Sequence, residues 1–183
     1  MPTSAANGSI FRPRHILRKP VLMQVYEAHG VRFEYPDGWE LSVDESEDQI
    51  AATVEGPGTA FWTMSLIFER PPAEEIIDSA LQCFEEEYGE VDVYESDERI
   101  CLLPTVAVNL DLISLDFVSK VALRACETDE FSIFSMFQIS EVEFEEHGPA
   151  LRAMNASLTW DSDDGDGSDA DPFEFDNLFG GGE

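Results

Sequence analysis

Apolar residues alternate with polar or small residues along most of this chain, which is the two-residue period of half-buried strands. The alternation is clearest at 59–68, and turn sequences such as Pro36-Asp37-Gly38 separate the predicted strands. The predicted strands are 21–28, 31–35, 39–43, 50–54, 59–68, 91–94, 100–103, 106–112, 118–126 and 131–139.

Two of these strands have unusual patterns. After Leu112 the apolar positions shift by one residue, and a shift of one residue exchanges the two faces of a strand. We therefore expect a bulge or bend near Leu112. The strand 131–139 is apolar on nearly both faces, as a central strand that is covered on both sides must be.

A first helix is predicted after Pro71-Pro72, because proline suits the first turn of a helix. Four apolar residues then recur at spacings of four, three and four and form one helical face. They are Ile77, Leu81, Phe84 and Tyr88. Gly89 is a typical helix stop. The three acids at 85–87 oppose the helix dipole, so we expect this helix end to be weak.

A second helix is predicted over 141–158, with Val142, Leu151 and Met154 among its buried residues. Gly148-Pro149 interrupts it, because a proline inside a helix removes a hydrogen bond and clashes with the preceding turn. We therefore expect a kink or two helical pieces.

Strands joined by short turns favour an antiparallel sheet with helices packed on it. The predicted fold class is α+β: an antiparallel β-sheet of about six or seven strands flanked by helices in an α/β/α sandwich, with disordered ends. We expect Trp39, Trp62 and Phe134 to be core residues and not ligand contacts.

Charge divides the 183 residues, whose net charge is −29, into three parts. We expect residues 1–20, with four bases and no acid, to form a flexible basic arm. Ordered patterning begins near Met23, which offers an alternative start of translation. Residues 21–160 form the α+β domain, with six bases and 30 acids. We expect residues 161–183, with nine acids, to form a disordered acidic tail, because their Asp, Gly and Ser residues cannot bury a core.

This excess of acids bears on the class of partner. It repels nucleic acid and anionic membranes and attracts cationic surfaces. We therefore expect a protein partner with a basic surface, no nucleic acid and no membrane. The alternative is that the charge serves solubility alone.

Three cysteines without CxxC spacing indicate neither a disulfide framework nor a zinc site, and a cytoplasmic location is expected. For the basic arm, a transit peptide is the alternative.

Catalysis by an acid–base or nucleophilic site needs a base poised near neutral pH beside a nucleophile. The histidines fall in the arm, in a turn and beside the Gly-Pro break: His15, His29 and His147. We interpret the cysteines as small hydrophobes: Cys83, Cys101 and Cys126. Phosphate-loop, nucleophile-elbow and metalloprotease motifs are absent, and the tail lacks the spacing of an EF-hand. We expect no enzyme, no cofactor and no metal site, with weak divalent-ion binding by the tail as the alternative.

The end of the tail has a different pattern, because four large apolar residues follow the Asp/Gly/Ser run in an acidic context: Phe173, Phe175, Leu178 and Phe179. Acidic residues steer an encounter and aromatic residues anchor it. We hypothesise that this segment docks into a partner pocket bordered by Lys or Arg. The alternative is that it folds back on its own domain or has no contact.

The run at 31–39, VRFEYPDGW, resembles the opening of PsbP-like domains, in which a strand leads into Tyr-Pro-x-Gly-Trp. The resemblance covers roughly 21–160 and points to an uncharacterised bacterial branch of the superfamily that also holds a Ran-binding nuclear-import factor. It implies an α/β/α sandwich, no shared catalytic residues, and an accessory or chaperone-like binding role. This chain differs in its acidic charge, its long tail and its lack of a secretory leader, which weighs against an envelope role.

Together these patterns favour a non-catalytic cytoplasmic protein-binding module, an adaptor or chaperone-like protein, with an acidic surface and a docking tail. The alternatives are an accessory structural subunit of a larger assembly and a small enzyme with an unrecognised carboxylate site.

Overall fold

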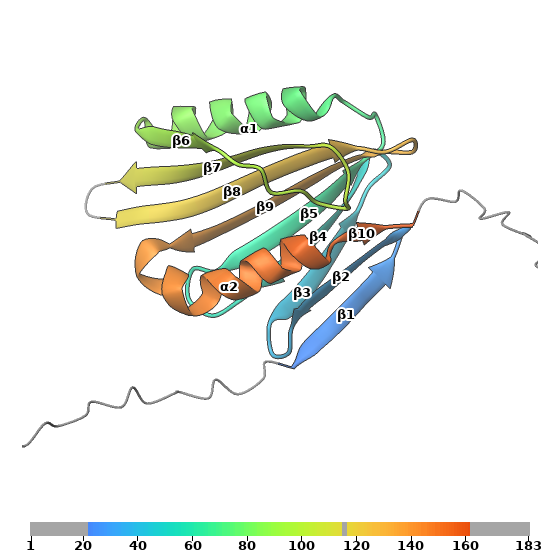
Figure 1. Cartoon of the computed structure of the whole chain (residues 1–183), viewed down its shortest axis with the longest axis horizontal. Helices are drawn as coiled ribbons and strands as arrows, with labels where there is room; N and C mark the ends of the chain where they lie inside the picture. The colour runs from blue at the N-terminus through green and yellow to red at the C-terminus, as the bar shows by residue number, and fades with distance from the viewer. Residues whose placement is uncertain (1–21, 115–116, 162–183) are drawn as a thin grey trace, which may run out of the picture.

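The computed structural model describes residues 22–114 and 117–161. A seven-stranded antiparallel sheet with one helix on each face forms the α/β/α sandwich that the sequence predicts (Figure 1). The strand order in this sheet is β3-β4-β5-β9-β8-β7-β6. Its strands are β3 (Glu40–Glu45), β4 (Gln49–Glu55), β5 (Phe61–Ile67), β6 (Val91–Glu95), β7 (Thr105–Ser114), β8 (Phe117–Glu127) and β9 (Ser132–Ser140).

The helices α1 (Ala73–Tyr88) and α2 (Glu141–Ser157) cover opposite faces of this sheet. Successive side chains of a strand point to opposite faces, so the same strands feed two apolar clusters. The cluster under α1 includes Ile77, Leu110 and Leu123, and the cluster under α2 includes Trp62, Ile133 and Leu151. The central strand β9 contributes to both, as predicted for 131–139.

Both helices begin and end close to the predicted residues. Helix α1 follows Pro72 and ends at Gly89, whose N–H donates to the carbonyl of Glu85 and whose φ of +74° suits glycine. Helix α2 is continuous through Gly148-Pro149, so of the two predicted alternatives, a kink or two helical pieces, the second is wrong. Packing explains this, because Gly148 is buried against the Phe144 ring and the next turn is fixed to the sheet by buried Leu151.

A second, three-stranded sheet was not predicted. It consists of β1 (Met23–Ala28), β2 (Val31–Pro36) and β10 (Thr159–Trp160), all paired antiparallel in the order β1-β2-β10. The sheet is joined to the core by Phe33, whose ring centroid lies 4.7 Å from that of Trp62. The two-residue strand β10 lies 123 or more residues from β2 in the chain, and no local pattern indicates such a pairing.

Two further strand predictions are corrected. Residues 100–103 form a turn and not a strand, since Cys101 and Leu102 have left-handed φ values of +53° and +57°. Strand β7 has no bulge near Leu112, because β7 and β8 pair residue by residue as far as Ser114 with Phe117. The one-residue shift of the apolar positions after Leu112 instead marks the end of the β7–β8 hairpin, where Phe117 is 75% exposed.

Burial follows the sequence prediction in part. Trp62 is fully buried, and so are Leu151 and Met154. Trp39 and Phe134 are only partly buried, although both pack against the apolar clusters. Val142 is 91% exposed, because it lies in the first turn of α2 on the side away from the sheet.

Candidate functional site

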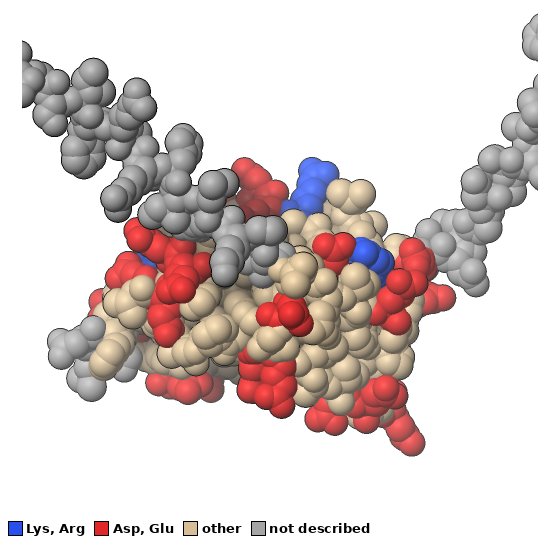
Figure 2. Space-filling view, turned by 90° about the horizontal axis from the view of Figure 1, so that it is seen from below, with Lys and Arg blue, Asp and Glu red and all other residues tan. Residues whose placement is uncertain are grey.

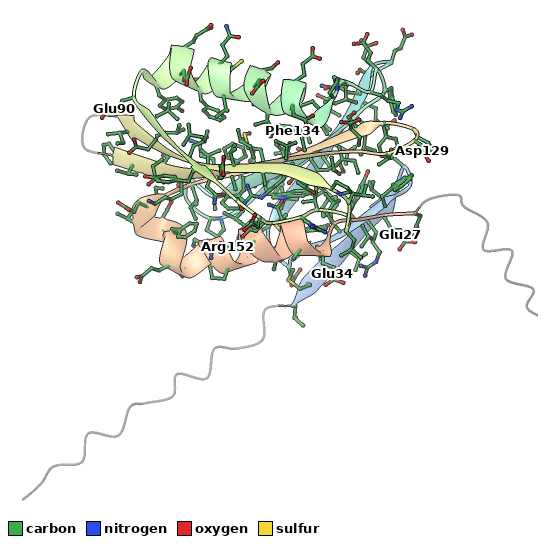
Figure 3. The ribbon with its side chains drawn as sticks, turned by 45° about the horizontal axis from the view of Figure 1, so that its top comes forward. Glu27, Glu34, Glu90, Asp129, Phe134 and Arg152 are labelled. Carbon is green, nitrogen blue, oxygen red and sulfur yellow. The ribbon has the colours of Figure 1, made fainter. Side chains whose placement is uncertain are left out.

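The outer face of α1 is acidic and contains no basic residue. Its exposed acids are Glu74, Glu75, Asp78, Glu85, Glu86 and Glu87. The turn that follows carries Glu90 and leads into β6, which lies beside the helix at one edge of the sheet (Figures 1 and 3). Within the described residues β6 pairs with β7 alone. The α1 acids, Glu90 and β6 are called the acidic α1–β6 surface below.

This surface also exposes apolar side chains on the edge strand. Val93 is 45% exposed and Tyr94 is 50% exposed, with Asp92 and Glu95 on either side of them. An edge strand with one unpaired side presents free N–H and C=O groups to a partner. Val93 points to the face of the sheet that α1 covers and Tyr94 to the opposite face, because their partners Leu110 and Asn109 alternate in the same way.

Few carboxylates of the domain are neutralised by bases. In the ranges 22–114 and 117–161, five carboxylates lie within 4.0 Å of a lysine or arginine nitrogen. They are Glu27, Glu34, Glu98, Asp111 and Glu141. Figure 2 shows the consequence on the face seen from below, where acidic side chains gather in several places and basic side chains are sparse.

A cavity of about 230 Å³ lies between the sheet and α2 and is called the α2 cavity below. One wall is an ion-paired group from adjacent strands. Asp111 of β7 is directly opposite Lys120 of β8, and Lys120 Nζ lies 2.8 Å from Asp111 Oδ2 and 3.3 Å from Glu141 Oε1. The hydrogen bond to Asp111 raises the pKa of Lys120, so this amine is charged at neutral pH.

Arg124 lies behind this wall and is 1% exposed. Its Nη1 donates to the carbonyls of Val108 and Leu123 at 2.7 and 2.8 Å. Its Nη2 donates to Asn109 Oδ1 at 2.8 Å and to Glu98 Oε2 at 2.5 Å, and both acceptor residues line the cavity. Arg124 Nε is buried and has no hydrogen-bond partner among the described residues. A buried guanidinium with an unpaired donor is uncommon in native structures.

The cavity lining also has an aromatic part. Phe137 of β9 and Phe144 of α2 line the cavity, and the guanidinium carbon of Arg152 lies 5.0 Å from the centre of the Phe144 ring. Figure 3 labels Arg152 on α2. In the described part of the chain no carboxylate oxygen lies within 4.0 Å of its guanidinium. Arg152 is therefore the cation at this cavity that lacks a carboxylate partner.

Glu143 forms a separate polar cluster at the start of α2. Its Oε2 accepts hydrogen bonds from Thr59 Oγ1, Thr59 N and Ser140 Oγ at 2.5, 3.1 and 2.7 Å. These hydrogen bonds, led by that of Thr59, hold the pKa of Glu143 below its usual value. The cluster joins the β4–β5 turn to α2, and we assign it a structural role.

The sequence-predicted residues fall in different places. The four tail residues of the docking hypothesis lie outside the described residues: Phe173, Phe175, Leu178 and Phe179. His29 Nε2 lies 3.3 Å from Glu45, and His147 contacts Trp39 edge to face, so the structure does not bring them together. His15 also lies outside the described residues.

The cysteines are distributed unevenly. Cys126 is fully buried, Cys101 is half-buried and Cys83 is exposed, so the prediction that all are buried hydrophobes holds for part of the set. A hydrogen bond with Cys126, together with burial, raises the pKa of the Cys101 thiol. A thiol with a raised pKa stays protonated at neutral pH and is a poor nucleophile.

Two further observations concern metals and membranes. Across residues 22–114 and 117–161, no three His, Cys, Asp or Glu side chains are grouped so that they could hold a metal ion. No helix in the same ranges has the length and apolar character needed to cross a membrane.

The α2 cavity was not predicted from the sequence, although a signal was present. Lys120 and Arg124 are two of the six bases of the domain and lie four residues apart in a predicted strand. Residues i and i+4 of a strand share a face. Two charges on one face of an interior strand indicate a polar site next to the core.

The fold defines the class of this chain as an α/β/α sandwich on an antiparallel sheet. No protein-family model matches the chain, and no curated protein matches it in sequence. Solved structures of similar fold include CyanoP, the cyanobacterial PsbP of Synechocystis sp. PCC 6803. It is 11% identical, with a TM-score of 0.45, over 87% of this chain and 98% of that chain.

Two other solved structures are similar. LpqN of Mycobacterium tuberculosis, which is involved in cell envelope biogenesis, is 12% identical with a TM-score of 0.41, over 77% of this chain and 91% of that chain. PA94 of Pseudomonas aeruginosa, a protein of unknown function, is 14% identical with a TM-score of 0.41, over 71% of this chain and 91% of that chain. A PsbP protein is thus among the structures to which this chain is similar. The similarity concerns the fold and assigns no role to a residue.

Proposed function

We propose that this chain is a non-catalytic protein-binding module, an adaptor or chaperone-like protein, which holds a partner with a basic surface on the acidic α1–β6 surface. One observation carries the proposal. A helix with six exposed acids and no base lies beside an edge strand that exposes Val93 on the same face of the sheet and Tyr94 on the opposite face.

The two parts of this surface have different physical roles. Unpaired carboxylates on α1 raise the rate of encounter with a cationic partner, and this effect weakens as salt screens the charges. Tyrosine is enriched among the residues that dominate binding energy, because it buries a large area at a small cost in conformational entropy. The free side of β6 offers backbone groups with which a partner segment can pair.

The tail supplies a second contact in this proposal. Phe173, Phe175, Leu178 and Phe179 anchor it in the partner, and the preceding aspartates steer it. Two linked contacts bind more tightly than either alone, because the second becomes intramolecular once the first has formed. A reducing cytoplasm is the proposed location, since the three cysteines form no disulfide.

The test compares two variants with the same change in net charge. One carries Glu85→Gln, Glu86→Gln and Glu87→Gln on α1, and the control carries Asp44→Asn, Glu47→Gln and Asp48→Asn around the β3–β4 turn. All six side chains are exposed, and removing acids from the end of a helix does not destabilise it. Proteins captured from a cell lysate by each variant and by the parent chain are identified and quantified.

Loss of a captured partner by the α1 variant, with retention by the control, supports the proposal. Equal loss by both variants would show that net charge alone attracts the captured proteins. Retention by both would place the binding surface elsewhere.

A further inference from the structure

The bases of the domain are not spread over its surface. Residues 21–160 contain six lysines and arginines among 30 acids. Three of the six, Lys120, Arg124 and Arg152, lie in or directly behind the walls of the α2 cavity. Burying charged side chains costs free energy unless partners compensate them. Half of the bases therefore lie around one cavity in a protein that is otherwise strongly acidic, with Arg124 fully buried, Lys120 partly buried and Arg152 exposed.

Two buried donors behind the cavity lining lack an acceptor in the described part of the chain. Lys120 is paired with Asp111 and Glu141, and Arg124 with Glu98 and Asn109, but Arg124 Nε and Asn155 Nδ2 are buried without a hydrogen-bond partner among the described residues. Asn155 is next to this group, because its Oδ1 accepts from Ser135, which is directly opposite Arg124 in the register of β8 and β9.

Arg152 adds a cation that lacks a carboxylate within 4.0 Å in the described residues. Its guanidinium lies over the Phe144 ring, which holds a planar cation while leaving its N–H edges available. The edge of a guanidinium matches the two oxygens of a carboxylate. Arg152 is therefore the lining donor that fits an anionic acceptor.

The aromatic part of the lining specifies the rest of the ligand. Phe137 of the sheet and Phe144 of α2 line a cavity of about 230 Å³ together with the polar residues. Sites for drug-sized ligands measure about 300–1,000 Å³, so this cavity suits a molecule with one ring or one short alkyl chain. We propose that the α2 cavity binds a small organic carboxylate, with its carboxylate on Arg152 beside Lys120 and its apolar body between Phe137 and Phe144. This site is independent of the acidic α1–β6 surface.

The test uses the full chain and four probes. The carboxylate probes are 3-phenylpropanoate and hexanoate, the neutral probe is 3-phenylpropanamide, and acetate lacks an apolar body. Binding is followed by NMR shift changes of the assigned chain. We expect both carboxylate probes to saturate with dissociation constants of about 1 mM or below, because the ligands are small. The shifts should centre on Lys120, Phe137, Phe144 and Arg152, and the amide and acetate should bind at least about tenfold more weakly.

Two variants remove one positive charge each. Arg152→Gln changes an exposed side chain at the cavity, and Arg32→Gln is the control on β2 of the small sheet. Arg152→Gln should weaken binding of 3-phenylpropanoate about tenfold and leave the amide unaffected, whereas Arg32→Gln should change neither. The proposal is overturned if neither carboxylate binds, if acid and amide bind equally, if both variants act alike, or if the shifts spread over the surface instead of the cavity.

Discussion

Trp62 Nε1 donates a 2.6 Å hydrogen bond to Asn155 Oδ1, and this bond joins the main sheet to α2 across 93 residues of chain. The same oxygen accepts a 2.5 Å hydrogen bond from Ser135 Oγ. Both donors are buried, so a single amide oxygen satisfies two polar groups inside the apolar cluster under α2. This arrangement fixes the position of α2 over the sheet and thereby sets one wall of the α2 cavity.

Asn155→Ala removes the acceptor and leaves Trp62 Nε1 and Ser135 Oγ buried without their partner. Leaving a buried donor unpaired costs about 1–3 kcal/mol, so we expect the free energy of unfolding to fall by at least that amount. Denaturant unfolding followed by tryptophan fluorescence measures the change. A double-mutant cycle with Trp62→Phe isolates the coupling. Additive losses in the cycle, or an unchanged midpoint for Asn155→Ala, would show that this hydrogen bond does not stabilise the fold.

Trp62→Ala and Trp39→Ala should differ in their effects, because Trp62 is fully buried and Trp39 is partly buried. Truncating Trp62 should cost about 3–5 kcal/mol through the cavity it leaves. Truncating Trp39 should cost about 1–2 kcal/mol, since it buries less area. Thermal and denaturant unfolding of the two variants make the comparison. If Trp62→Ala kept the melting temperature of the parent, its assignment to the core would be wrong.

Because of Glu143, we expect the free energy of unfolding of the domain to vary with pH in the acid range. Its pKa in the folded protein is lowered by hydrogen bonds from Thr59 and Ser140. A lowered pKa contributes stability that is present above the ordinary value of 4.5 and is lost as the pH falls through the folded value. The stability difference between the parent and Glu143→Gln should therefore shrink as the pH falls below about 4.5.

Glu146→Gln provides the control for this titration, because Glu146 is an exposed acid on the same helix without an ion pair in the described residues. Unfolding free energies of the parent and both variants are measured from neutral to acid pH. A difference for Glu143→Gln that stayed constant throughout, or that Glu146→Gln reproduced, would contradict the role given to these hydrogen bonds.

The local patterns of the sequence predicted most of the secondary structure. The apolar spacing from Ile77 to Tyr88 defines α1, and the two-faced pattern of 131–139 identifies the central strand β9. These predictions succeed because the period of apolar residues follows directly from the geometry of each element. The turn at 100–103 was missed, because a short apolar run is buried equally well in a strand or in a turn, as Ile100 shows with 1% exposure.

The candidate sites depend on contacts that no local pattern contains. The pairing of Lys120 with Asp111 requires the register of β7 and β8, and the position of Arg152 requires the docking of α2 on the sheet. The exposure of Tyr94 follows from the place of β6 at an edge, which depends on the order of all seven strands. Long-range topology therefore decides which polar residues meet. The sequence indicated that the surface is acidic, but not that α1 lies beside the edge strand β6.

Hydrogen–deuterium exchange of the chain, alone and in complex with a captured partner, tests the proposed function most directly. Amides that become paired or covered on binding exchange more slowly. We expect slower exchange across 74–95, which covers α1 and β6, and unchanged exchange across 40–48, which covers β3 and the turn that follows it. A complex in which 74–95 exchanges as fast as in the unbound chain would contradict binding through the acidic α1–β6 surface.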